Sequence, residues 1–255
     1  MSTISGEAQR PLRIAVCVPT HENVPAMFAF DLASMLVYSQ GTLVAEGLAE
    51  LTMMMRKGTY VHTARESLCE EVLQAGYDFI LWLDSDMRFP RDTLTRLLQH
   101  GKAMVGANYS TRGAPYRYVA IETLENEHAG EGRQLATTEE STGLAKVAAI
   151  GFGALLMRTT VLTSMLEDRP WFFYEYGDAG HVGEDVFFCQ KARKHDWEIY
   201  VDHDLSKLVA HIGQFEYEVG QVSRLKADFQ ETIGGDVRED DTPAEEPTPA
   251  LKLVE

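Results

Sequence analysis

The stretch FILWLDSDMRFP, residues 79–90, places five apolar residues directly before Asp84, Ser85 and Asp86. A short unbroken apolar run of this kind is typical of a strand that is buried on both faces of a parallel sheet. Ligands of open α/β sheets collect at the carboxyl ends of such strands. Two carboxylates at that end are costly to bury unless something positive lies beside them. The stretch therefore predicts an α/β fold and a site for a positive partner at the edge of its sheet.

The sequence around this strand alternates between strand and helix patterns. Compact apolar runs predict further strands at 13–19, about 48–55 and 103–109. Helices are expected between them at 27–40, 63–75 and 90–100. This alternation predicts a mostly parallel central sheet with helices on both faces. After residue 109 the pattern changes to short strands without long helices between them, which predicts a mixed portion of the sheet.

The later part of the chain adds smaller elements and a polar tail. The patterns predict a short helix at 159–166, an amphipathic helix at 184–196 and a strand at 197–201. Residues 1–12 are small and polar, which predicts a flexible lead. Residues 231–255 are acidic and contain proline, so little can be buried there and a disordered tail is expected. One folded domain over 13–230 remains.

The composition restricts the partners of the protein. The 255 residues include 39 acidic and 23 basic side chains, giving a net charge of -16. Such a chain repels polyanions, so contact with nucleic acid would need a local basic patch. The three cysteines form no CxxC pair, and neither a disulfide framework nor a zinc knuckle is indicated. No signal-peptide pattern and no apolar run near 18 residues are seen, so we expect a soluble, cytoplasmic protein.

The two aspartates suit a divalent cation. Carboxylates two positions apart at a strand end can reach one ion, and oxygen ligands suit Mg²⁺ or Mn²⁺, which bridge nucleotide diphosphates. Capping of the next helix is the simpler alternative, although that helix is expected to begin only near Pro90. Phosphatases of the haloacid-dehalogenase type have a similar strand end. Arg88 stands where they carry Thr or Val, and the motif does not open the fold here.

Four stretches taken together resemble the GT-A glycosyltransferases, particularly the family 2-like group. They are IAVCVPTHENVP (14–25), YVHTARESLCEEVLQAGYDFILWLDSDMRFP (60–90), GFGALLMRTTVL (151–162) and HVGEDVFFCQKARKHDWEIYVD (181–202). The resemblance implies a GT-A catalytic domain over 13–230. It also implies a hexosyltransferase-type enzyme that uses Mn²⁺ or Mg²⁺. Such an enzyme moves a sugar from a nucleotide-diphosphate donor, of UDP type, to a hydroxyl acceptor.

The resemblance also assigns roles to residues. Asp185, with Glu184 beside it, would be the general base, and Asp86 would bind the metal directly, with Asp84 and His211 as further candidate ligands. The implied nucleotide-sugar-binding residues are Pro19, Thr20, Glu22, Arg65, Asp84, Ser85, Asp86 and Gly153.

Several of these roles have simpler alternatives. Acidic residues at a helix start stabilise the helix dipole without any catalytic role. His211 beside apolar residues could be an ordinary hydrogen-bonded histidine. We expect Gly151 and Gly153 to let the backbone run close to a donor sugar. Arg112 and Arg117 could bind an anionic acceptor or be solvated loop charges. The aromatic run at 171–176 could stack on an acceptor or close the core.

The sequence also departs from the family pattern. A QxxRW motif is absent, which favours a single, inverting transfer over polymer synthesis. The acceptor could be a glycan, a protein, a metabolite or a hydroxylated nucleobase in DNA, although the net charge does not favour DNA. A nucleotidyltransferase and a non-catalytic nucleotide-sugar-binding protein are the alternatives. The former usually carries a glycine-rich basic loop after its first strand, and THENVP (20–25) is not such a loop.

Overall fold

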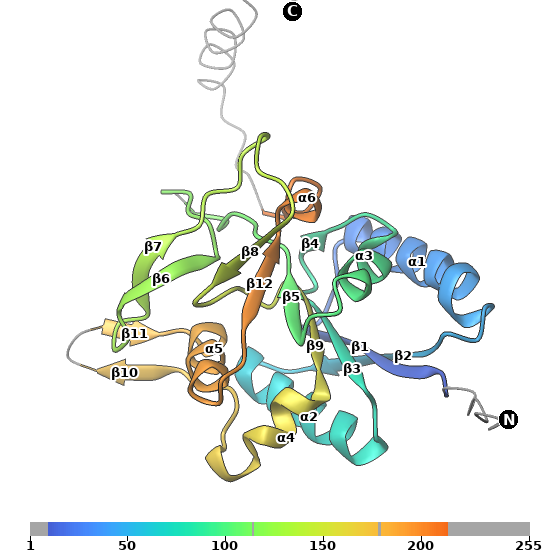
Figure 1. Cartoon of the computed structure of the whole chain (residues 1–255), viewed down its shortest axis with the longest axis horizontal. Helices are drawn as coiled ribbons and strands as arrows, with labels where there is room; N and C mark the ends of the chain where they lie inside the picture. The colour runs from blue at the N-terminus through green and yellow to red at the C-terminus, as the bar shows by residue number, and fades with distance from the viewer. Residues whose placement is uncertain (1–9, 114, 178–179, 214–255) are drawn as a thin grey trace, which may run out of the picture. The chain divides into compact units, whose positions relative to one another are not determined.

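The computed structural model describes residues 10–113, 115–177 and 180–213. Its centre is a mixed sheet of seven strands flanked by helices, a Rossmann-like arrangement that agrees with the predicted α/β class (Figure 1). The strand order is β2-β1-β3-β9-β5-β12-β8. The strands are β1 (Leu12–Thr20), β2 (Ala49–Lys57), β3 (Phe79–Leu83), β5 (Met104–Gly106), β8 (Leu144–Val147), β9 (Ala154–Arg158) and β12 (Ile199–Asp202).

Helices cover both faces of this sheet (Figure 1). The helices are α1 (Ala26–Ser39), which continues as a π-helical turn η1 (Gln40–Val44), α2 (Val61–Ala75), α3 (Thr93–Gln99), α4 (Thr159–Ser164), the 3-10 turn η2 (Leu166–Asp168), α5 (Glu184–Lys194) and α6 (His203–Ser206). Alternate residues of β1 face opposite layers because side chains of a strand have a period of two. Ile14 and Val16 pack in the layer with α1 and α3, whereas Ala15 and Cys17 pack in the layer with α2, α4 and α5.

The middle of the sheet differs from the simple parallel prediction. Strands β2, β1 and β3 are parallel, as expected, but β9 lies between β3 and β5 and is antiparallel to both. All of β9 from Ala154 to Met157 is buried, so this strand can fill a central position. The expected strand at 103–109, observed as β5, is therefore separated from β3, because β9, which follows β5 by about fifty residues, lies between them.

Three small ribbons complete the described structure. They are β4 (Met87–Arg88) with β13 (Ala210–His211), β6 (Ile121–Asn126) with β7 (Glu131–Gln134), and β10 (Glu175–Gly177) with β11 (Gly180–Val182). The first ribbon brings the end of the described chain beside the segment that follows β3. Residues 1–9 and 214–255 lie outside the described residues, so the predicted lead and tail remain predictions.

The first helix is longer than expected and corrects the expectation that no apolar stretch approaches 18 residues. The helical stretch Ala26–Val44 is long and apolar enough, by length and composition, to cross a membrane, with a mean hydropathy of 1.2. It exceeds the expected length because η1 continues the helix past Gly41, where the sequence pattern predicted an end. Core helices of soluble proteins meet the same criteria when most of their residues are buried, whereas 28% of this stretch is buried. Phe28, Leu32 and Met35 of α1 pack against the sheet. The cytoplasmic location stays a prediction.

Candidate active site

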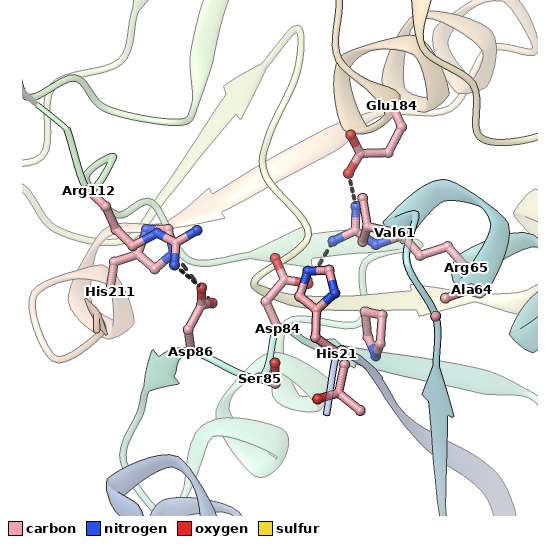
Figure 2. A pocket seen from close by; sticks show the side chains of 13 residues that line it. His21, Val61, Ala64, Arg65, Asp84, Ser85, Asp86, Arg112, Glu184 and His211 are labelled. Carbon is pink, nitrogen blue, oxygen red and sulfur yellow. Dashed lines mark hydrogen bonds and ion pairs between the residues drawn. The ribbon is translucent and has the colours of Figure 1, made fainter. Parts of the chain in front are cut away.

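A cavity of about 300 Å³ lies at the carboxyl ends of β1 and β3, where the strand pattern predicted a site. It gathers residues from β1, α2, the segment after β3, the start of α5 and β13. Of the predicted site residues, the following line it: Pro19, Thr20, Arg65, Asp84, Ser85, Asp86, Glu184 and His211. In Figure 2, Asp84 and Asp86 lie between Arg65 and Glu184 on one side and Arg112 and His211 on the other.

Arg65 supplies the positive charge beside the strand end. It lies on the inner face of α2 and is 2% exposed. Its Nη2 donates to Oδ1 of Asp84 at 2.7 Å, and its Nη1 donates to Oε1 of Glu184. The guanidinium also lies over the ring of Phe152, 5.2 Å from the ring centroid. The carboxylate that follows β3 and the one at the start of α5 thus share one buried cation.

The charge of Arg65 is permanent. Burial alone would lower the pKa of this guanidinium, but the negative charges of Asp84 and Glu184 outweigh burial and raise it. Two buried polar atoms of lining residues lack a hydrogen-bond partner among the described residues. They are Nε of Arg65 and Oγ1 of Thr20, and both are buried. Unpaired buried polar groups are costly, so these two atoms lower the stability of the fold beside the cavity.

Asp86 faces a different set of partners. Nη1 of Arg112 lies 2.7 Å from its Oδ2, and Nε2 of His211 lies 3.4 Å from its Oδ1. Pairing of β13 with β4 brings His211 to this position, and N of Ile212 donates to the backbone oxygen of Asp86 at 2.7 Å. Burial alone would raise the pKa of Asp86, but His211 and Arg112 outweigh it, so the pKa lies below its usual value.

The three predicted metal ligands do not converge. Within residues 10–113, 115–177 and 180–213, no three His, Cys, Asp or Glu side chains are placed to share one metal ion. One oxygen of Asp84 is bonded to Arg65, which separates it from the pair formed by Asp86 and His211. That pair offers an oxygen and an imidazole nitrogen, donors that suit Mn²⁺. Such a pair fits a cation whose remaining ligands are phosphate oxygens and water.

The two acidic residues at the start of α5 have different positions. Glu184 lines the cavity, whereas Asp185 is not among the lining residues. N of Val186 donates to Oδ1 of Asp185 at 2.8 Å. Burial, with the negative charge of Glu184, raises the pKa of Asp185 to about 6, although Arg65 acts in the opposite direction. A carboxylate with this pKa is a stronger base than a solvated aspartate.

The structure gives the glycines of the 151–153 turn a different role from the expected one. The amide of Gly153 donates to the hydroxyl oxygen of Tyr109 at 2.9 Å. A Cβ on Gly153 would lie 2.5 Å from this oxygen, and a Cβ on Gly151 would lie 2.4 Å from it. Neither glycine lines the cavity. A side chain at either position would collide with Tyr109, and the approach of Gly153 to a donor sugar stays a prediction.

Two further expectations change. Glu22 lies outside the cavity lining, with its side chain 75% exposed and paired with Lys57 at 2.7 Å. The aromatic run divides, because Trp171 and Phe172 are buried in the core while Tyr176 is 79% exposed. The first two residues therefore close the core, as the simpler alternative predicted.

Some lining residues were missed by sequence reasoning. They are His21, Gly58, Val61, Ala64 and Arg112. Gly58 and Val61 follow β2, which ends beside β1 because the two strands are parallel and in register. Because parallel strands end at the same edge of a sheet, the sequence could have predicted that the residues after β2 line the site. For Arg112 the sequence indicates only an acceptor-binding residue or a solvated loop charge. No local pattern predicts its contact with Asp86.

Comparisons with known proteins add little. No protein-family model matches the chain, and no curated protein matches it either. Among solved structures, the chain is similar to the one titled "Crystal Structure of A197 from STIV", with 16% identity and a TM-score of 0.48. The match covers 82% of this chain and 98% of the other. A likeness this distant carries no argument about function, which must be argued from the site itself.

Proposed function

We propose that this protein is a divalent-cation-dependent glycosyltransferase that moves a hexose from a UDP-type donor to a hydroxyl acceptor. One observation carries the proposal. The cavity at the carboxyl edge of the sheet combines a buried, permanently charged Arg65 with the pair Asp86 and His211 (Figure 2). A nucleotide-diphosphate sugar needs both features, because its diphosphate is anionic and is usually bound together with a cation.

Arg65 is suited to hold the donor's diphosphate. Its guanidinium is fixed by Asp84 and Glu184, so little entropy is lost when an anion binds beside it. In this proposal Pro19, Thr20 and Ser85 complete the nucleotide side of the cavity.

Asp86 and His211 are the residues that would hold the cation. A bound Mn²⁺ or Mg²⁺ would offset the negative charge that develops on the leaving diphosphate. Asp84 would act indirectly, because it keeps Arg65 in place.

Asp185 is the proposed general base. The acceptor's hydroxyl proton passes to the Asp185 carboxylate while the hydroxyl oxygen attacks the anomeric carbon. The bond from that carbon to the diphosphate oxygen breaks, and the configuration inverts. The raised pKa of Asp185 supports this role, since a base is most effective when its pKa lies near the working pH. Glu184 is less suited, because its carboxylate is held by Arg65.

A donor screen tests the proposal. Nucleotide-diphosphate sugars are incubated with Mn²⁺ or Mg²⁺, and release of nucleoside diphosphate is measured with and without candidate hydroxyl acceptors. We expect slow, cation-dependent release of UDP from a UDP-hexose without acceptor. The Asp86→Ala variant should lose both donor binding and release. The Asp185→Asn variant should bind UDP normally and lose about 10²- to 10⁴-fold in transfer, the usual contribution of a general base.

The alternatives give different results. A nucleotidyltransferase would release pyrophosphate from a nucleoside triphosphate, and a non-catalytic binding protein would bind donor without any release. In the latter case Asp185→Asn would change nothing. Either result would replace the proposed function.

A further inference from the structure

The contact between Arg112 and Asp86 joins two loops at the mouth of the cavity. Arg112 follows β5, and its Nη1 lies 2.7 Å from Oδ2 of Asp86. The same loop is fastened to β13, because Nδ1 of His211 lies 3.1 Å from the backbone oxygen of Ser110. The rings of Tyr109 and His211 also meet edge to face, 5.5 Å apart. The loop and β13 thus place one cationic side chain on the carboxylate that a metal ion would need.

An arginine and a divalent cation compete for the same carboxylate. Both are positive, so each disfavours the other within a few ångströms. In the structure Arg112 pairs with Asp86. Arg112 pairs with Oδ2 of Asp86, whereas His211 faces Oδ1. A cation between Oδ1 and the imidazole would lie beside the guanidinium, so it binds more strongly once Arg112 leaves this carboxylate.

Arg112 differs from Arg65 in its ability to leave. Its side chain is 55% exposed, and Asp86 is its ion-pair partner in the described part of the chain, whereas Arg65 is 2% exposed and has two. Exposed ion pairs contribute little to stability, so breaking this one costs little. The planar guanidinium also matches the oxygens of a diphosphate, which it can bind through two parallel hydrogen bonds.

We propose that Arg112 is an exchangeable ligand-binding residue. It neutralises Asp86 when the cavity is empty and pairs with the donor's diphosphate once a divalent cation occupies Asp86. The inference rests on the proposed function. It adds that cation and nucleotide bind cooperatively, because the diphosphate gives Arg112 a new partner at the moment when the cation takes its old one.

Binding measurements on four proteins test this inference: wild type, Arg112→Gln, Arg112→Lys and Arg117→Gln. Arg117 is an exposed arginine of the same loop without an ion pair among the described residues, so its variant is the matched control. Electron paramagnetic resonance of free Mn²⁺ measures cation binding without nucleotide. Calorimetry measures UDP binding at saturating Mn²⁺. Thermal unfolding checks that all four proteins are folded.

The expected effects have opposite signs. Arg112→Gln should bind Mn²⁺ alone about two- to fivefold more tightly, because a competing exposed ion pair is lost. The same variant should bind UDP with Mn²⁺ on the order of tenfold more weakly, because a charge-assisted contact is lost. Arg112→Lys should stay close to wild type in Mn²⁺ binding and recover part of the UDP binding. Arg117→Gln should change neither affinity by more than about twofold.

Two results would overturn the inference alone. One is an unchanged Mn²⁺ affinity in Arg112→Gln, and the other is a change of both affinities in the same direction. If wild type binds neither Mn²⁺ nor UDP, the proposed function itself fails and this inference fails with it. The wild-type titrations therefore separate the two failures.

Discussion

The two carboxylates of the Asp84-Ser85-Asp86 segment are almost equally exposed, yet their partners are opposite in character. Asp84 is 27% exposed and Asp86 is 24% exposed. Asp84 binds Arg65, which is buried in the core and also held by Glu184. Asp86 binds Arg112, which is mostly in solvent. A single strand end thus has one structural ion pair and one that can be exchanged.

The burial of the cation, rather than of the carboxylate, makes this difference. A buried guanidinium that loses one of its acids leaves a charge that water cannot reach, which costs several kcal/mol. An exposed guanidinium that loses its acid is simply hydrated. The motif DSD alone therefore does not show which of its aspartates remains available to a ligand.

Removal of Arg65 should have the largest effect on stability. In Arg65→Met, Asp84 and Glu184 lose their shared cation, and Glu184 remains buried without a cationic partner. We expect a loss of about 3–5 kcal/mol in the free energy of unfolding, measured by urea denaturation.

A second variant keeps this prediction testable if Arg65→Met does not fold. The triple variant Arg65→Met, Asp84→Asn, Glu184→Gln removes the uncompensated charges, and we expect it to regain much of the lost stability. A loss below about 1 kcal/mol in Arg65→Met would show that the buried pair is not structural.

Substitution of the acidic residues at the start of α5 should change the free energy of unfolding by an intermediate amount, and the sign for Asp185 follows from its raised pKa. The pKa of Asp185 is raised from 3.8 to about 6, so the folded protein holds a proton that the unfolded chain has lost between these pH values. The contribution of this group to stability therefore falls as pH rises from about 4 to 6 and stays low above 6. Asp185→Asn should be more stable than wild type at pH 8, by on the order of 2 kcal/mol.

Urea denaturation at pH 5 and pH 8 checks this sign, since the advantage of Asp185→Asn should be smaller at pH 5. Glu184→Gln is the matched comparison. It removes a partner of Arg65 and should lower stability by about 1.5–3 kcal/mol at pH 8. Equal effects of the two substitutions would contradict the different environments described above.

The smallest effect on stability is expected at Arg112. Arg112→Gln should change the free energy of unfolding by no more than about 1 kcal/mol, because its ion pair is exposed. The measurement is the same urea denaturation at pH 8. A loss comparable to that of Arg65→Met would mean that Arg112 is a structural residue and not an exchangeable one.

Much of the fold and part of the site could be predicted from local patterns. The run FILWL corresponds to β3, and Gly76 ends α2 in the left-handed conformation, as a glycine after a helix suggests. The resemblance assigned both Arg65 and Asp84 to the nucleotide-sugar site, and they share a hydrogen bond. Glu22 and Gly153 were assigned to the site by the family resemblance. In the structure the Glu22 side chain pairs with Lys57, and the Gly153 amide donates to Tyr109.

The sequence by itself determined which segments form the main strands and helices, and that carboxylates stand at the end of a buried strand. These properties depend on periodicity and on neighbours along the chain. Only the tertiary structure decided that β9 enters the sheet between β3 and β5, and that Arg65 serves Asp84 while Arg112 and His211 serve Asp86. Such pairings join residues 19 to 125 positions apart. They follow from which surfaces pack together, and no local pattern records that.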